Sequence, residues 1–165
     1  MRFTLNSLIV SAALALSGCA SYVPVPKDYS GPTAVLKDSG FSEDGTKAQI
    51  FAAMEIDGNR LENAFGATAN ASQGRGMSIL TVFPERKVKA VPSKIQIRAS
   101  HATGAPVAAI ASQMAGTFFS VEGIIEFTPQ AGGVYVVKGE LKKEKSSVWI
   151  EDAQTGKPAT VIVSK

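Results

Sequence analysis

The sequence predicts an all-β protein, an antiparallel β-sandwich of about eight strands. Three observations support this class. Apolar and polar residues alternate along several segments after residue 46, which is the period of a half-buried strand. The apolar runs are short. Clusters of Gly, Pro, Asp and Asn separate them, as turns separate the strands of a sandwich.

The chain begins with the features of a secretory signal. Arg2 is the only charged residue before Cys19, and residues 3–16 are largely apolar. A bilayer core needs about 20 residues in a helix, so this run is too short to span one. We therefore expect residues 1–18 to be a signal peptide. A helix buried in the domain is the alternative.

The four residues Leu16-Ser17-Gly18-Cys19 resemble the lipobox of bacterial lipoproteins. The resemblance covers residues 1–19 only. It implies cleavage after Gly18, attachment of diacylglycerol to the sulfur of Cys19 and acylation, with chains such as palmitate, of the new amino terminus. The residue after the cysteine is Ala20. In lipoproteins of this kind a residue other than aspartate at that position implies the outer membrane, and we expect the domain to lie in the periplasm. The alternative for Cys19 is an incidental thiol in a discarded peptide.

Composition limits the possible partners and cofactors. The chain has one cysteine, so it has no internal disulfide and no cysteine-based metal site. Loss of Arg2 with the signal peptide lowers the formal charge from +3 to +2, which gives no reason to expect a nucleic-acid partner. The length suits one domain. We expect no cofactor and no metal.

The segment after the signal is rich in proline. Residues 19–32 comprise the acylated cysteine and a Pro-rich sequence that disfavours helix, so we expect a semi-rigid tether. An edge strand that includes Tyr22 and Val23 is the alternative, because edges tolerate proline. The sandwich domain is expected to fill residues 33–165.

The first predicted strand runs from Ala48 to Ile56, although Phe51 and Ala53 blur its alternation. Asp57-Gly58 is a strong hairpin signal, so we expect the partner strand within residues 60–65. Residues 66–76 are small and polar and are predicted to form a mobile loop.

Residues 77–83 are apolar on both faces and predict a central strand. In the next strand, Ile95 and Ile97 face one way, and Lys94, Gln96 and Arg98 face the other. Residues 106–114 form the one plausible helix, although its valine and isoleucine allow a strand instead.

The last third of the chain predicts strands joined by Gly-rich or polar turns. If residues 117–127 and 134–141 pair as a hairpin through the turn 129–133, glutamates and lysines meet across it. The remaining expected elements are a turn at 142–147, a strand at 148–150, a turn at 154–158 and a strand at 159–164. Residues 86–97 and 132–157 weakly resemble small immunoglobulin-like or transthyretin-like sandwich lipoproteins of bacteria, a group with no assigned activity.

Catalytic constellations are absent or weak. His101 is the only histidine, and its setting predicts a solvated loop residue rather than a general base. Glu122 and Glu126 would lie roughly 13 Å apart on one strand face, too far apart for glycoside hydrolysis. Residues 38–46 look like a polar hairpin loop and lack the ligand spacing of a calcium loop.

One segment has features of a binding site. Residues 85–98 are basic, and alternation places Lys94 and Arg98 on one face, where they could meet an anionic lipid or glycan. The alternative is a charged strand edge that prevents aggregation.

The sequence therefore predicts a non-catalytic, membrane-anchored envelope lipoprotein with a structural or protein-interaction role and an unknown envelope partner. The alternative is a binding module for an anionic envelope glycan or lipid, and a hydrolase is the least favoured reading.

Overall fold

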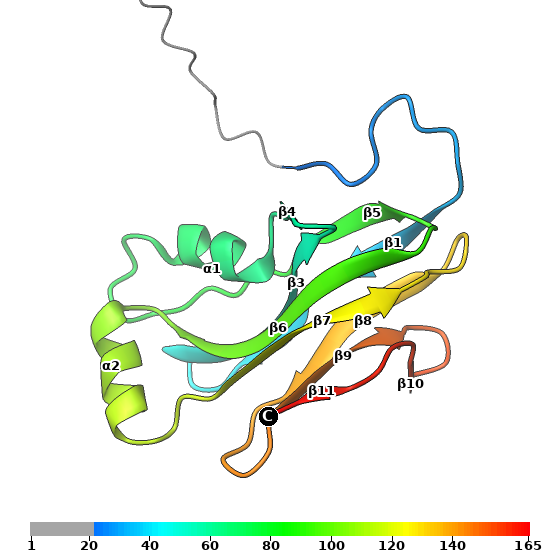
Figure 1. The fold of residues 1–165 in the computed structure, drawn as a ribbon. Helices are drawn as coiled ribbons and strands as arrows, with labels where there is room; N and C mark the ends of the chain where they lie inside the picture. The colour runs from blue at the N-terminus through cyan, green and yellow to red at the C-terminus, as the bar shows by residue number, and fades with distance from the viewer. Residues whose placement is uncertain (1–21) are drawn as a thin grey trace, which may run out of the picture.

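The computed structural model describes residues 22–165 (Figure 1). The signal peptide and the lipidation residue Cys19, both predicted from sequence, lie outside the described residues. Within the described range most of the regular structure is β, arranged in two sheets that pack face to face with two short helices beside them. The prediction of a mostly-β, two-sheet domain is confirmed.

The first sheet is mixed, which the sequence did not predict. Strand β1 runs antiparallel to β5 and parallel to β8, and β8 runs antiparallel to β9. The expectation of purely antiparallel strands is therefore wrong at one pair. In spatial order the strands are β10 (Lys157–Pro158), β9 (Ser147–Asp152), β8 (Val134–Glu140), β1 (Thr33–Lys37) and β5 (Glu85–Lys89), and β11 (Val163–Ser164) also pairs with β9.

The second sheet is antiparallel throughout. Strand β6 lies at its centre and pairs with β3 on one side and β7 on the other. The turn at Asp57-Gly58 has positive φ at both residues, 49° and 78°, as a tight hairpin requires, so that prediction is confirmed. The strands are β2 (Ser39–Ser42), β3 (Lys47–Ile56), β6 (Ser93–Thr103) and β7 (Ser120–Phe127), and β4 (Asn59–Arg60) pairs with β3.

The main core lies between the two sheets and follows the predicted alternation. Ile95 and Ile97 of β6 point into it, as do Val121 of β7 and Val137 of β8. Burial of each such side chain contributes about 1.5–3 kcal/mol to folding. Gly139 allows the facing sheets to approach closely, because an added Cβ would lie 2.9 Å from the ring of Phe51.

A second, smaller cluster lies on the outer face of β3. Ala48, Ile50 and Ala52 are fully buried there against Ala64 of helix α1 (Ala64–Ser72). Because β3 is covered on both faces, Phe51 and Ala53 are buried as well, and this explains why its alternation looked blurred in the sequence.

Helix α1 corrects two predictions. Residues 60–65 were expected to form a strand and residues 66–76 a mobile loop. Only the two residues of β4 pair with β3, and a nine-residue helix follows. The Oδ1 of Asn63 accepts hydrogen bonds from the N–H groups of Phe65 and Gly66, which caps the helix start. The cap and the cover it supplies to β3 outweigh the poor helix propensity of the segment.

The predicted central strand at residues 77–83 is also wrong. These residues have no regular secondary structure. Hydroxyl groups of α1 accept hydrogen bonds from their backbone instead: Ser72 Oγ from the N–H of Leu80 at 2.9 Å, and Thr68 Oγ1 from the N–H of Val82 at 3.0 Å. These hydroxyl groups therefore take the place of the backbone acceptors that a neighbouring strand would have provided.

Strands β7 and β8 do not form a hairpin. The turn at 129–133 passes from one sheet to the other, so the glutamates and lysines do not meet as predicted. Both strands bury one apolar face in the same core, and that places them across it from each other. Phe127 and Tyr135 meet there edge to face with centroids 4.9 Å apart.

Helix α2 (Pro106–Met114) has the predicted bounds. The C-terminal strand is shorter than predicted, because only Val163 and Ser164 pair with β9. Residues 43–46 form the expected turn, whereas Ser39–Ser42 is strand β2.

Asp38 was expected in a polar loop and is buried instead, at the crossing between the two sheets. Its carboxylate accepts hydrogen bonds from the N–H groups of Ala53 and Ala64 and from Arg86 Nη1, at 3.1, 2.8 and 2.9 Å. Burial raises the pKa of Asp38, and the neighbouring Arg86 guanidinium and these hydrogen bonds oppose the rise. Asp38 thus joins β1, β3, β5 and the start of α1.

Candidate functional site

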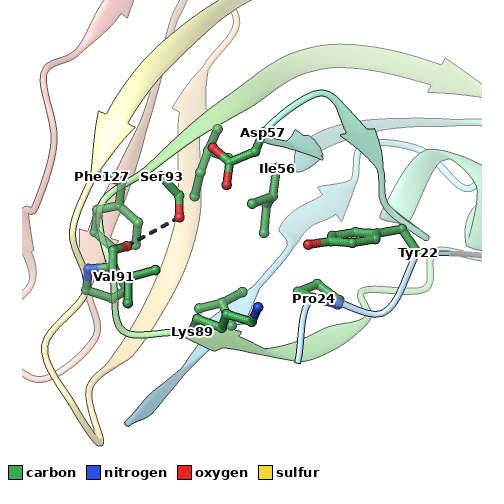
Figure 2. Close-up of a pocket in the computed structure, with 11 residues that line it drawn as sticks. Tyr22, Pro24, Ile56, Asp57, Lys89, Val91, Ser93 and Phe127 are labelled. Atoms are coloured by element: carbon green, nitrogen blue, oxygen red, sulfur yellow. Dashed lines mark hydrogen bonds between the residues drawn. The ribbon is translucent and has the colours of Figure 1, made fainter. Parts of the chain in front are cut away.

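A pocket opens at one end of the sandwich (Figure 2). Its volume is about 150 Å³. The walls come from the first described residues, the end of β3, the β5–β6 turn, the start of β6 and the end of β7. The lining residues are Tyr22, Pro24, Ile56, Asp57, Val88, Lys89, Val91, Ser93, Ile95, Phe127 and Pro129.

Two charged side chains lie at this pocket, Asp57 and Lys89, and Figure 2 shows them on facing sides of it. The Oδ1 of Asp57 accepts a hydrogen bond from the N–H of Lys94 at 2.8 Å, and the Asp57 N–H donates to the Lys94 carbonyl at 2.8 Å. This pair of bonds fixes the hairpin turn against the start of β6. The ammonium of Lys89 lies 5.1 Å from the ring centroid of Tyr29.

The predicted tether contacts the domain. Tyr22 packs against the main core and Pro24 is buried. The N–H of Ala90 also donates a hydrogen bond to the carbonyl of Pro32 at 2.9 Å. Residues 22–32 contain no strand, so the alternative of an edge strand is not observed. The segment that follows Tyr22 is thus held at the pocket end of the domain.

The structure places Lys94 and Arg98 on one face of β6, as alternation predicted. Each has a glutamate beside it on β7. Lys94 pairs in register with Glu126, and Arg98 Nε lies 3.8 Å from Glu122 Oε2. The guanidinium of Arg98 also lies 5.2 Å from the ring centroid of Phe65. The face of the sheet that carries Lys94 and Arg98 is therefore mixed in charge, and anion binding at these two residues stays a prediction.

His101 is not a loop residue, which corrects the sequence prediction. It lies on β6 and its side chain is 3% exposed. The N–H of Phe119 donates to His101 Nδ1 at 3.0 Å, so that nitrogen carries no proton, and Nε2 donates to Glu43 Oε1 at 3.1 Å. Burial, followed by the charge of Lys47, holds the pKa of His101 below its ordinary value, although Glu43 opposes the shift.

The His101 cluster fastens the segment that follows α2. Besides the Phe119 bond, Lys47 Nζ donates to the carbonyl of Thr117 at 2.6 Å and lies 3.6 Å from Glu43 Oε2. Sequence reasoning missed this cluster, but a signal was present. His101 continues the inward positions of Ile95, Ile97 and Ala99 at the same spacing of two.

Helix α2 exposes apolar side chains. Val107 is 64% exposed, Ile110 58% and Met114 85%, and the helix has no buried residue. No charged residue lies between Arg98 and Glu122, apart from the buried and neutral His101. The pocket lies at the start of β6 and α2 just beyond its end, so the two features occupy opposite ends of the domain (Figure 1).

Two further findings concern residues 22–165. Neither helix in this range is long and apolar enough to cross a membrane. The same residues show no cluster of three or more His, Cys, Asp or Glu side chains placed to hold a metal ion. Comparisons with protein-family models, curated proteins and solved structures gave no significant match. The fold and site described above define a two-sheet β domain with a small end pocket and an exposed apolar helix.

Proposed function

We propose that this protein is a non-catalytic lipoprotein of the bacterial envelope, anchored to the outer membrane through acylated Cys19. Its domain lies in the periplasm and acts by binding an envelope protein through α2. The exposed apolar face of α2 is the single observation that carries the interaction role. The immunoglobulin-like or transthyretin-like type of sandwich is part of the proposal, and the two facing sheets with mostly antiparallel pairs support it.

The partner should present an apolar groove. An amphipathic helix docks into such a groove through side chains spaced three or four residues apart, and Val107, Ile110 and Met114 have this spacing. Because α2 carries no charged side chain, charges on a partner would lose their water against it without gaining an ion pair, and this cost disfavours a charged partner surface. A bilayer is a poorer candidate for α2, because interfacial helices carry Lys and Arg on their polar face.

The alternative, an anionic ligand at Lys94 and Arg98, has less support. Glu122 and Glu126 lie beside these side chains and reduce the positive potential that an anion would meet.

Site-specific photo-crosslinking in intact cells tests the interaction role. A crosslinker at Met114 should capture a discrete partner, and Ile110→Glu should abolish that capture. Val161→Glu is the matched control, because Val161 is also apolar and 72% exposed but lies outside α2. Capture that survives Ile110→Glu, or that is lost equally with Val161→Glu, would contradict the role of α2.

The anchor needs a separate test. Labelled palmitate should enter the wild type and not Cys19→Ala, and mass spectrometry should find the acyl groups on the cysteine. Equal labelling of both proteins would exclude the anchor.

A further inference from the structure

The end of the domain near the pocket lies close to the predicted anchor. Tyr22 lies three residues after Cys19, and a chain of that length spans at most about 11 Å. Tyr22 is part of the pocket wall and packs on the core. If Cys19 is acylated, the pocket end therefore cannot lie far from the bilayer surface.

The surface at this end suits contact with a bilayer. Val23 is 65% exposed and Val91, in the β5–β6 turn, is 37% exposed. A second depression beside the pocket shares Asp57 and Phe127 with it and adds Lys94 and Glu126. Because both signs of charge are present, attraction to the surface should depend little on salt.

The opposite end of the domain lies far from the pocket. Strand β6 begins at the pocket with Ser93 and ends at Thr103, a rise of roughly 33 Å at 3.3 Å per residue. Helix α2 follows three residues later. An orientation that places the pocket on the bilayer thus presents α2 to the periplasm.

The size and polarity of the pocket limit its ligand. A volume of about 150 Å³ is below the roughly 300–1,000 Å³ of sites that hold drug-sized ligands, so the pocket suits a small polar group rather than an extended acyl chain. Apolar walls surround one carboxylate, from Asp57, and one ammonium, from Lys89, which approach from facing sides in Figure 2. A small zwitterion with its own ammonium and phosphate matches this pair of charges.

We infer that the pocket end of the domain rests on the anchoring bilayer and that the pocket binds a phospholipid headgroup with a primary ammonium, placing the ammonium at Asp57 and the phosphate at Lys89. The inference rests on the proposed lipid anchor and adds to it an orientation and a ligand. A primary ammonium donates hydrogen bonds to a carboxylate, whereas a trimethylammonium is bulkier and donates none.

The orientation is tested with the full-length acylated protein in vesicles of phosphatidylethanolamine and phosphatidylglycerol that carry a nitroxide on some headgroups. A fluorescent label is placed at Val91→Cys or, as the control, at Met114→Cys; Cys19 is blocked by its acyl chain. We expect several-fold stronger quenching at position 91 than at 114. Equal or weaker quenching at 91, in a protein shown to carry its acyl chains, would overturn the orientation and leave the anchor intact.

The headgroup is tested by replacing phosphatidylethanolamine with phosphatidylcholine at the same ratio to phosphatidylglycerol. Because Val91 lines the pocket, the label for this test is moved to Ala131→Cys, in the exposed turn between β7 and β8. Quenching at position 131 should fall, and Asp57→Asn should remove the difference between the two lipids. Asparagine keeps an acceptor for the Lys94 N–H and tolerates the positive φ of position 57.

Two further variants complete this test. Lys89→Gln should also remove the lipid difference, whereas Lys143→Gln, in the exposed turn after β8, should keep it. Equal quenching in both lipids, or a difference that persists in Asp57→Asn and Lys89→Gln, would overturn the headgroup site. Absence of acyl mass on Cys19 would instead overturn the proposed anchor.

Discussion

Mild acid should destabilise this domain through His101. The neutral ring accepts the Phe119 N–H at Nδ1, at 3.0 Å. A proton on that nitrogen would remove the acceptor and place a positive charge near the Lys47 ammonium, in a side chain that is 3% exposed. Protonation should therefore loosen the connection between β6 and the segment that follows α2.

The sign and size of the effect follow from proton linkage. The pKa of His101 is lowered in the folded protein, so the unfolded chain takes up this proton first as the pH falls below about 6.5. The contribution to stability is present above that pH and is lost as the pH falls toward the folded pKa. The loss reaches at most about 1.4 kcal/mol per pH unit.

The assay is urea unfolding in detergent between pH 8 and pH 5, followed by the fluorescence of Trp149, the single tryptophan. His101→Asn is the matched variant, because asparagine Oδ1 lies as many bonds from Cα as Nδ1 does and does not titrate. Asp38 has a raised pKa in the folded protein, so its contribution to the free energy of unfolding falls as the pH rises. Both proteins share this contribution, and it cancels when their pH dependences are subtracted. The same pH dependence in both proteins would refute the reasoning.

Three other changes give expected outcomes for stability by the same assay at neutral pH. Asp38→Ala leaves the Arg86 guanidinium buried without its carboxylate and should lower the free energy of unfolding by about 3–5 kcal/mol. Adding Arg86→Met should recover part of this loss in the double variant. A loss of less than about 1 kcal/mol in Asp38→Ala would contradict the view that this buried ion pair supports the fold. Gly139→Ala should destabilise by about 1–3 kcal/mol, because its Cβ would meet a backbone oxygen of β9 at 2.7 Å. Gly66→Ala in α1 meets nothing within 4 Å and should stabilise by about 0.5–1 kcal/mol, so the same sign for both glycine variants would refute the packing argument.

Local pattern was a reliable guide wherever one face of a strand is buried and the other exposed. Strand β6 has this form, and its inward residues Ile95 and Ile97 were predicted from alternation alone. The turn at Asp57-Gly58 and helix α2 were also predicted, because turn chemistry and a proline at the first helical turn act within a few residues.

The same rules failed where a segment gains its stability from distant partners. Helix α1 is small and polar in sequence, and it forms because Asn63 caps it and β3 requires cover on its outer face. Residues 77–83 are apolar like a strand, yet the hydroxyls of Thr68 and Ser72 take their backbone hydrogen bonds.

For the candidate site, the sequence by itself provided the features of the anchor, the apolar residues of α2 and the face shared by Lys94 and Arg98. Only the tertiary structure brought Tyr22, Asp57, Lys89 and Phe127 into one pocket. It also buried His101 against Glu43 and placed β7 and β8 in different sheets. The physical reason is that alternation fixes which face of a strand is apolar, whereas the strand or helix that covers this face is chosen by packing across the whole chain.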